Sequence, residues 1–298
     1  MEEVKTQRSP LIFNRFFLKV LGLALMTLDH ISYLLVAFSV FVKDDSFILI
    51  TRGLGRMALP LFALLIVEGV THTKSFGKYA LRLGIGASIV SLAMIFVEYV
   101  PIFGALTIRS EGIIFLDLLL GALAVFCLKD KRILIKAISV AIIGYSIAST
   151  WAHGLECVAC STEIWFVPFF MRTQYDFTGV LLIIFIYLGK ELAKYILSKF
   201  NGAYDNTPTE QLMYNVGMLF GIAFITIISY IFIKYSYQWF NLVNDQNPSI
   251  QGLSIFSCIF VLFYNGRRGY ESKWFKYGCY LYYPVHVIIL YLLFVLIF

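Results

Sequence analysis

Apolar segments close to twenty residues long recur along this entire chain, and no other feature limits its fold more strongly. A helix needs about 20 apolar residues to cross the roughly 30 Å hydrocarbon core of a bilayer. Of the 298 residues, 60% are hydrophobic and 14% are charged, whereas about 25% are charged in an ordinary soluble domain. The sequence therefore predicts an all-α, polytopic integral membrane protein, with no stretch left for a sizeable soluble domain.

The apolar pattern predicts about nine transmembrane helices in a helical bundle, forming a single domain over residues 1–298. A further segment at residues 164–171, IWFVPFFM, is too short to cross a bilayer. We expect it to be interfacial or re-entrant, or else to extend the sixth span. The nine expected spans are residues 16–42, 48–70, 79–100, 113–128, 133–151, 177–189, 211–233, 250–264 and 275–298.

The positions of lysine and arginine predict the orientation, because short cytoplasmic connections retain positive charge during insertion. Eighteen of the 24 basic residues fall within residues 5–19, 74–82, 129–136, 190–199 and 267–276. We expect these parts, and hence the amino terminus, to be cytoplasmic in a multi-pass protein of the cell membrane. The net charge of +6 is then explained by basic residues spread over the cytoplasmic connections. We therefore do not expect nucleic acid as a partner.

Two ionisable residues, Asp29 and His30, are expected near the bilayer midplane in the first span. A charged side chain there costs about 2.5–3.5 kcal/mol on insertion, so it marks a candidate functional site. Adjacent helix residues point about 100° apart, so each of the two needs a partner from another helix. A shared polar pocket satisfies both, and a structural polar contact between helices is the alternative.

Other spans carry polar residues at similar depth. Arg56 precedes the helix-kinking Pro60 in the second span and needs a carboxylate or backbone carbonyls as a partner; Asp29 and Asp117 are the candidate carboxylates. His286 lies near midplane in the last span, just after Tyr283. Either residue could equally serve a purely structural role in a packed bundle.

A basic segment, THTKSFGKYALRL, lies between the second and third spans. Lys78 and Arg82 are four residues apart and share one helical face, close to Lys74, His72 and Glu68. Such a cluster suits the phosphates of an anionic cytoplasmic donor, and arginine favours bidentate phosphate contacts. A topogenic or lipid-headgroup role is the alternative.

The segment HGLECVAC contains His153 and a Cys-x-x-Cys pair, Cys157 and Cys160, on the expected outer side. A zinc site usually needs more ligands than these, so we expect a disulfide or a plain loop, and no metal.

The residue chemistry alone leaves two classes of function open. A midplane histidine with a polar partner, open to a basic cytoplasmic patch, suits transfer of a group from an inner donor to an outer acceptor, with histidine as general base. Intramembrane aspartate and histidine equally suit a proton-coupled secondary transporter or a lipid flippase. A noncatalytic partner in envelope assembly is a third alternative.

Six ordered pieces of the sequence carry a family resemblance over residues 18–298. They are LK with ALMTLDH, GRMALPLFALLIVEG, THTKSFGKYALRL, YDFTGVLLIIFIYL, FYNGRRG and YYPVH. The chain resembles the TraX family, membrane proteins associated with amino-terminal acetylation of conjugative pilin. Through that family it also resembles the wider transmembrane acyltransferase class.

That class carries a basic residue and a histidine separated by ten residues in the first span, and Lys19 and His30 fit this spacing. The resemblance implies acetyl-CoA as the donor, His30 as the central catalytic group and THTKSFGKYALRL as the donor-binding segment. It leaves the extracytoplasmic acceptor open between a protein amino terminus and a glycan. Asp117 and the CVAC loop depart from the family pattern, and both lie where an acceptor would be recognised.

The expected mechanism places the donor phosphates on basic residues near the inner face, with the thioester reaching a midplane pocket. A histidine there deprotonates the acceptor, and its polar neighbours shape the pocket or stabilise the oxyanion. The residues expected at the catalytic centre are His30, Asp29, His286, Arg56 and Tyr283, and those expected at the donor site are Lys78, Arg82, Lys74, Glu68 and His72.

Overall fold

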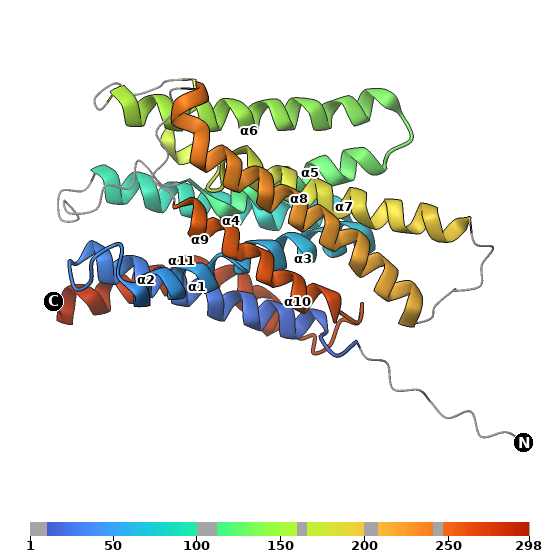
Figure 1. Ribbon diagram of the computed structural model, residues 1–298, viewed down its shortest axis with the longest axis horizontal. Helices are drawn as coiled ribbons and strands as arrows, with labels where there is room; N and C mark the ends of the chain where they lie inside the picture. Colours follow the sequence, from blue (N-terminus) through green and yellow to red (C-terminus); the bar gives the residue numbers. More distant parts are fainter. Residues whose placement is uncertain (1–10, 100–111, 160–165, 200–207, 241–246, 298) are drawn as a thin grey trace, which may run out of the picture.

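A computed structural model describes residues 11–99, 112–159, 166–199, 208–240 and 247–297. Within these residues the regular structure is helical, apart from two isolated bridges (Phe13 with Tyr264, Ile113 with Thr173). Figure 1 shows the long helices running along roughly one common direction, as in a membrane bundle. The helices are α1 (Arg15–Ala37), α2 (Ser46–Gly55), α3 (Ala58–His72), α4 (Phe76–Tyr99), α5 (Ile114–Lys129), α6 (Ile133–Ala159), α7 (Asp176–Ser198), α8 (Pro208–Phe240), α9 (Pro248–Gly252), α10 (Ser257–Leu262) and α11 (Lys273–Ile297), with the 3-10 helices η2 (Phe169–Met171) and η3 (Leu253–Phe256).

Six helical segments of the described chain are long and apolar enough to cross a membrane: α1, α2 with α3, α4, α6, α8 and α11. The three other expected spans correspond to α5, α7 and the α9–α10 segment. Of these, α5 has 16 residues and α7 carries charged residues in its second half. The observed class is thus an all-helical membrane protein, and nine crossings remain a prediction.

Two of the expected continuous spans are interrupted. The second span is divided into α2 and α3 at Arg56 and Met57. Pro60 follows one turn later and lacks the N–H that would bond to the carbonyl of Arg56, which explains the break. The eighth expected span is three short pieces, α9, η3 and α10, rather than one helix.

Two expected loops fall partly outside the described residues. The interfacial segment at residues 164–171 is described only from Phe166, where it forms η2. Residues 172–175 separate η2 from α7, so this segment does not extend the sixth span. The Asn, Gly and Pro content of residues 200–210 also predicts a flexible cytoplasmic loop. Residues 200–207 lie outside the described residues, and Pro208 begins α8.

The core is centred on α3, which is buried along most of its length, whereas α1, α4, α6 and α11 each bury one side only. Helix α3 packs against α1, α5 and α7. A helix that is apolar on all sides fits either the interior of a bundle or contact with lipid, and here α3 takes the interior while the outer helices present their remaining apolar surface to lipid. This arrangement places the carboxyl-terminal end of α3, with Glu68 and His72, among the surrounding helices.

The turn before α11 is fixed to the start of α1. The Phe13 N–H donates to the Phe263 carbonyl at 3.0 Å, and the Arg15 N–H donates to the Arg267 carbonyl at 2.9 Å. Gly269 has φ +73° and lies against Asn14, which caps α1 by accepting from the Phe17 N–H at 2.9 Å. A side chain at this position would be strained and would clash with the cap. The contact brings residues about 250 positions apart together at one end of the bundle.

Candidate active site

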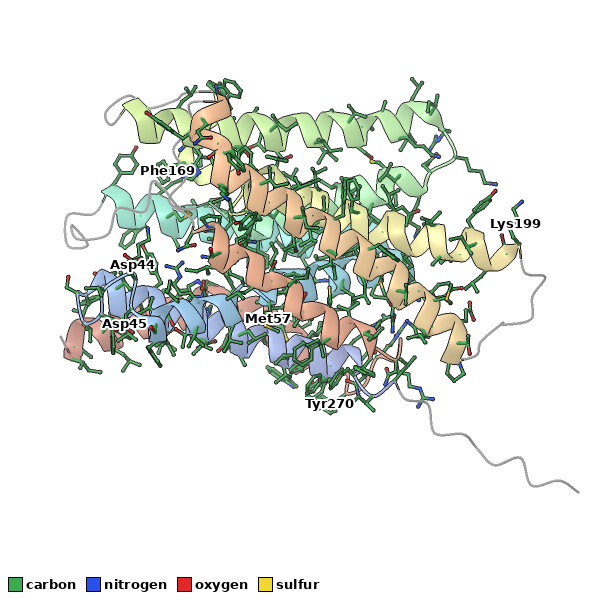
Figure 2. The ribbon with its side chains drawn as sticks, in the orientation of Figure 1. Asp44, Asp45, Met57, Phe169, Lys199 and Tyr270 are labelled. Atoms are coloured by element: carbon green, nitrogen blue, oxygen red, sulfur yellow. The ribbon has the colours of Figure 1, made fainter. Side chains whose placement is uncertain are left out.

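A cavity of about 530 Å³ lies between α1, α3, α4, α5 and α11. Six arginine and lysine side chains and two glutamates line it, together with His72. Tyr270, at its charged end, is labelled in Figure 2 well away from the end of the bundle that carries Asp44 and Asp45. The basic residues are Arg15, Lys19, Arg82, Arg268, Lys273 and Lys276.

Two helices line the cavity from its charged end toward the two histidines. On α1, Lys19, Leu23 and Met26 line it in succession, and His30 follows four residues later on the same face. On α11, Lys276, Tyr280 and Tyr283 do so, and His286 follows three residues later. Spacings of three and four keep side chains on one side of a helix. From Lys19 to His30 the helix rises about 16 Å, since each residue adds 1.5 Å.

His30 and His286 contact each other where α1 and α11 meet. Nε2 of His286 lies 3.4 Å from Nδ1 of His30, and the ring centroids are 5.0 Å apart. Nδ1 of His30 lies 2.8 Å from the Met26 carbonyl oxygen, and Nδ1 of His286 lies 2.8 Å from the Tyr282 carbonyl oxygen. A carbonyl only accepts, so each neutral ring carries its proton on Nδ1 and has its lone pair on Nε2.

Tyr283 separates the cavity from the histidine pair. It lines the cavity, and its ring stands edge-on to His30 at 6.1 Å and to His286 at 5.8 Å between centroids. Neither histidine is among the cavity-lining residues. The cavity therefore ends one ring short of the histidines, and the structure brings His30, His286 and Tyr283 together.

Polar residues near His30 form a second group. Asp29 lies 3.5 Å from the guanidinium of Arg52, a residue of α2. The same guanidinium lies over the ring of Tyr33. The guanidinium of Arg56 lies over the ring of Tyr175, 5.8 Å from its centroid. The sequence reasoning considered only Arg56 as the partner of Asp29 and missed Arg52, although Arg52 lies one helical turn before Arg56.

Asp117 has a structural contact. Its Oδ2 accepts the backbone N–H of Gln174 at 2.7 Å, just before α7 begins at Asp176. A carboxylate at a helix amino terminus is favoured by the unpaired N–H groups there. Asp117 thus anchors the start of α7 from a neighbouring helix.

Glu68 lies in a buried group of charged side chains at the cavity wall. It is 2% exposed and pairs with Lys190 of α7 and with Arg15, whose Nη2 lies 2.5 Å away. The Tyr264 hydroxyl donates to it at 3.2 Å, and Nδ1 of His72 lies 3.6 Å away. Glu68 therefore holds Arg15 in place at the charged part of the cavity.

The predicted donor residues separate into two sets. Arg82, Glu68 and His72 line the cavity, whereas Lys74 and Lys78 are exposed and do not. The sequence reasoning did not assign the cavity cations of α1 and of residues 268–276 to the donor site. Lys19 lies 11 residues before His30 and Lys276 lies 10 residues before His286, and this similar spacing is the signal that could have found these two.

The expected outer cysteine pair is only partly covered: Cys160, like the side chain of Cys157, lies outside the described residues. His153 lies 3.8 Å from Asp176. Over the described ranges, no group of three or more potential metal-ligating side chains occurs.

Comparison with known proteins places the chain in a family. The profile of the TraX protein family matches residues 14–294. A 72-residue segment is 38% identical to a protein named probable fimbrial assembly protein FimC, serogroup H1, of Dichelobacter nodosus, covering 24% of this chain and 27% of that protein. The match thus spans about a quarter of that relative, and no solved structure matches. With nearly its whole length matched, the chain belongs to the TraX family.

Proposed function

We propose that this protein transfers an acetyl group from acetyl-CoA, bound in the cavity, to an amine or hydroxyl acceptor that reaches His30 from the outer side. The observation that carries the proposal is the cavity itself, which is basic at one end and ends beside a histidine pair. Family membership supports it, because TraX proteins are associated with pilin acetylation and resemble transmembrane acyltransferases.

The donor site suits a long ligand with phosphates at one end. Six basic side chains against two carboxylates leave the charged end positive. Among the described residues, none accepts a hydrogen bond from the buried Nε of Arg82, and a buried donor without a partner costs about 1–3 kcal/mol. A phosphate oxygen would satisfy it. Lys19, Lys276 and Arg82 are accordingly the phosphate-binding residues in this proposal.

His30 would act as the general base. Its Nδ1–H is held by the Met26 carbonyl, so Nε2 presents a lone pair. Nε2 of His286 faces the same Nδ1–H and would stabilise the imidazolium that forms when His30 takes a proton. Tyr283 would turn aside to let the thioester approach, and Asp29 with Arg52 and Arg56 would keep the acceptor side polar.

The transfer balances without a further reactant. Acetyl-CoA supplies an activated thioester carbonyl. His30 takes the proton from the attacking nitrogen or oxygen as the new bond to the acetyl carbon forms. The same proton then passes from Nε2 to the sulfur that leaves as the carbon–sulfur bond breaks. Water exclusion by the surrounding helices would limit hydrolysis of the donor.

The acceptor in this proposal is the amino terminus of a pilin-like protein. The partial match to a protein named for fimbrial assembly supports this choice, as does the family resemblance. An amino sugar or a glycan hydroxyl would react by the same steps, so acceptor identity is tested separately from donor use.

The donor site is tested by two matched double variants in detergent-purified protein. Lys19→Gln with Lys276→Gln removes two cations that line the cavity, and Lys74→Gln with Lys78→Gln removes two cations that do not. Each hydrogen bond to a charged group contributes about 1.5–3 kcal/mol, so the first variant should weaken acetyl-CoA binding at least about ten-fold. The second should bind like the wild type. Equal losses in calorimetry would reject the cavity as the donor site.

The catalytic step is tested with His30→Ala. We expect acetyl transfer to a pilin-derived peptide to fall by about 10²–10⁴ while acetyl-CoA binding is retained. Undiminished transfer by the folded variant would refute the role of His30. Substrate accumulation by wild-type proteoliposomes without acetyl-CoA consumption would instead indicate a transporter.

A further inference from the structure

Aromatic rings close the end of the cavity that lies farthest from its charged end. The rings of Phe115, on α5, and Tyr283, on α11, stand edge-on with centroids 5.3 Å apart and an interplanar angle of 87°. Both line the cavity, as do Met26, Ile114 and Leu118 beside them. The basic residues of α1 and α11 lie toward the starts of these helices, and the lining residues beside the two rings are apolar. In the proposed function, the acyl group of the donor occupies this apolar end.

Phe115 has little room to move. It is 6% exposed, and a Cβ added at Gly86 of α4 would lie 2.9 Å from its ring atoms Cδ1 and Cε1. The ring therefore packs directly on the α4 backbone, while Tyr283 and Tyr280 contact it from α11. Moving it to admit further methylene groups would force neighbouring side chains out of a close-packed core, which is costly.

We propose that Phe115, packed against Gly86 of α4, sets the upper size of the donor acyl group and restricts it to acetyl or a group of similar size. This proposal rests on the proposed function and adds its specificity-determining residue. A hydrophobic pocket discriminates by about 10–200-fold per methylene group. One fixed ring at the end of the cavity therefore suffices to select the chain length.

The test compares acetyl-CoA with hexanoyl-CoA as donors for the full-length protein in detergent. Phe115→Ala removes the wall and should raise the ratio of kcat/KM for hexanoyl-CoA over acetyl-CoA by at least about ten-fold. Phe115→Leu, which retains more of the core, should give a smaller shift in the same direction and covers the case that the alanine variant does not fold.

A matched control is Phe185→Ala, which removes a phenylalanine that stacks on Phe224 outside the cavity lining. It should leave the donor ratio unchanged. An unchanged ratio in both Phe115 variants would overturn the proposed role of the wall, provided the wild type uses acetyl-CoA. A wild type that neither binds nor consumes acetyl-CoA would instead overturn the proposed function, so the two failures are distinguishable.

Discussion

Glu68 is a single carboxylate that joins three helices at the cavity wall. Arg15 of α1 and Lys190 of α7 contact it directly, and Lys190 is itself only 5% exposed. Charged side chains buried away from water are tolerated only when opposite charges compensate them. Removing one member leaves the others buried without compensation, which costs about 3–5 kcal/mol.

We therefore expect Glu68→Gln to lower the unfolding free energy in detergent by about 3 kcal/mol. Adding Lys190→Met should recover part of the loss, since the uncompensated ammonium is then gone. The control is Glu191→Gln, which breaks the half-exposed pair with Lys194 and should cost about 1 kcal/mol or less. Thermal unfolding of the three variants checks this, and equal losses for Glu68→Gln and Glu191→Gln would contradict it.

For single residues, the sequence indicated which ionisable side chains lie within apolar spans, but it did not indicate which of them contact each other. The matched depth of His30 and His286 was visible in the sequence, and the structure places their rings in contact. The partner of Glu68 on α7 was not visible, because Lys190 is 122 positions away and was counted as a topogenic charge. Which side chains pair across two helices depends on how each helix is rotated about its own axis. The residue pattern of a single helix does not determine that rotation.

The close approach of helices α7 and α8 depends on glycine residues at their contact. Gly189 and Gly217 face each other across the α7–α8 contact, and a Cβ on either would overlap the carbonyl oxygen of the other. Gly221, four residues after Gly217, packs in the same way on the carbonyl of Phe185. Small residues four apart are typical of close helix pairs in membranes. This spacing was present in the sequence, and the sequence reasoning missed it.

Gly217→Ala should separate the two backbones and lower the unfolding free energy by about 1–3 kcal/mol, the usual cost of overpacking. Gly144→Ala of α6 is the control, because a Cβ there would meet no atom within 4 Å in the described structure. It should leave the protein as stable as the wild type or slightly more so. Thermal unfolding in one detergent compares the two, and equal stability would show that the close approach is not needed.

Hydropathy predicted where the helices lie far better than where they break. Every expected span overlaps a helical segment, because apolar length alone decides what a bilayer accommodates. The division at Arg56 depends on Pro60, and the three pieces of residues 248–262 depend on packing against α2 and α8. Such local departures are tertiary effects, so the apolar pattern does not contain them.

The whole molecule has two chemically different ends. The α5–α6 connection, the end of α7 and the starts of α1 and α11 lie together at one end in Figure 1, and the α1–α2 connection lies at the other. The end that holds the α5–α6 connection carries the basic clusters. Within it, hydrogen bonds from Arg132 lower the pKa of Asp130 to about 2, and the connection stays positive through Lys129, Lys131 and Lys136. The charged end of the cavity belongs to this end.

That arrangement predicts which face each end occupies in the cell. Asp44 and Lys199 are exposed and mark opposite ends in Figure 2. With Cys157 and Cys160 replaced by serine, a membrane-impermeant maleimide should label Asp44→Cys in intact spheroplasts and Lys199→Cys only after lysis, because basic connections stay in the cytoplasm. The reverse pattern would place the basic end of the cavity outside, where acetyl-CoA is not supplied. The donor proposal would then fall even if every contact around His30 were as described.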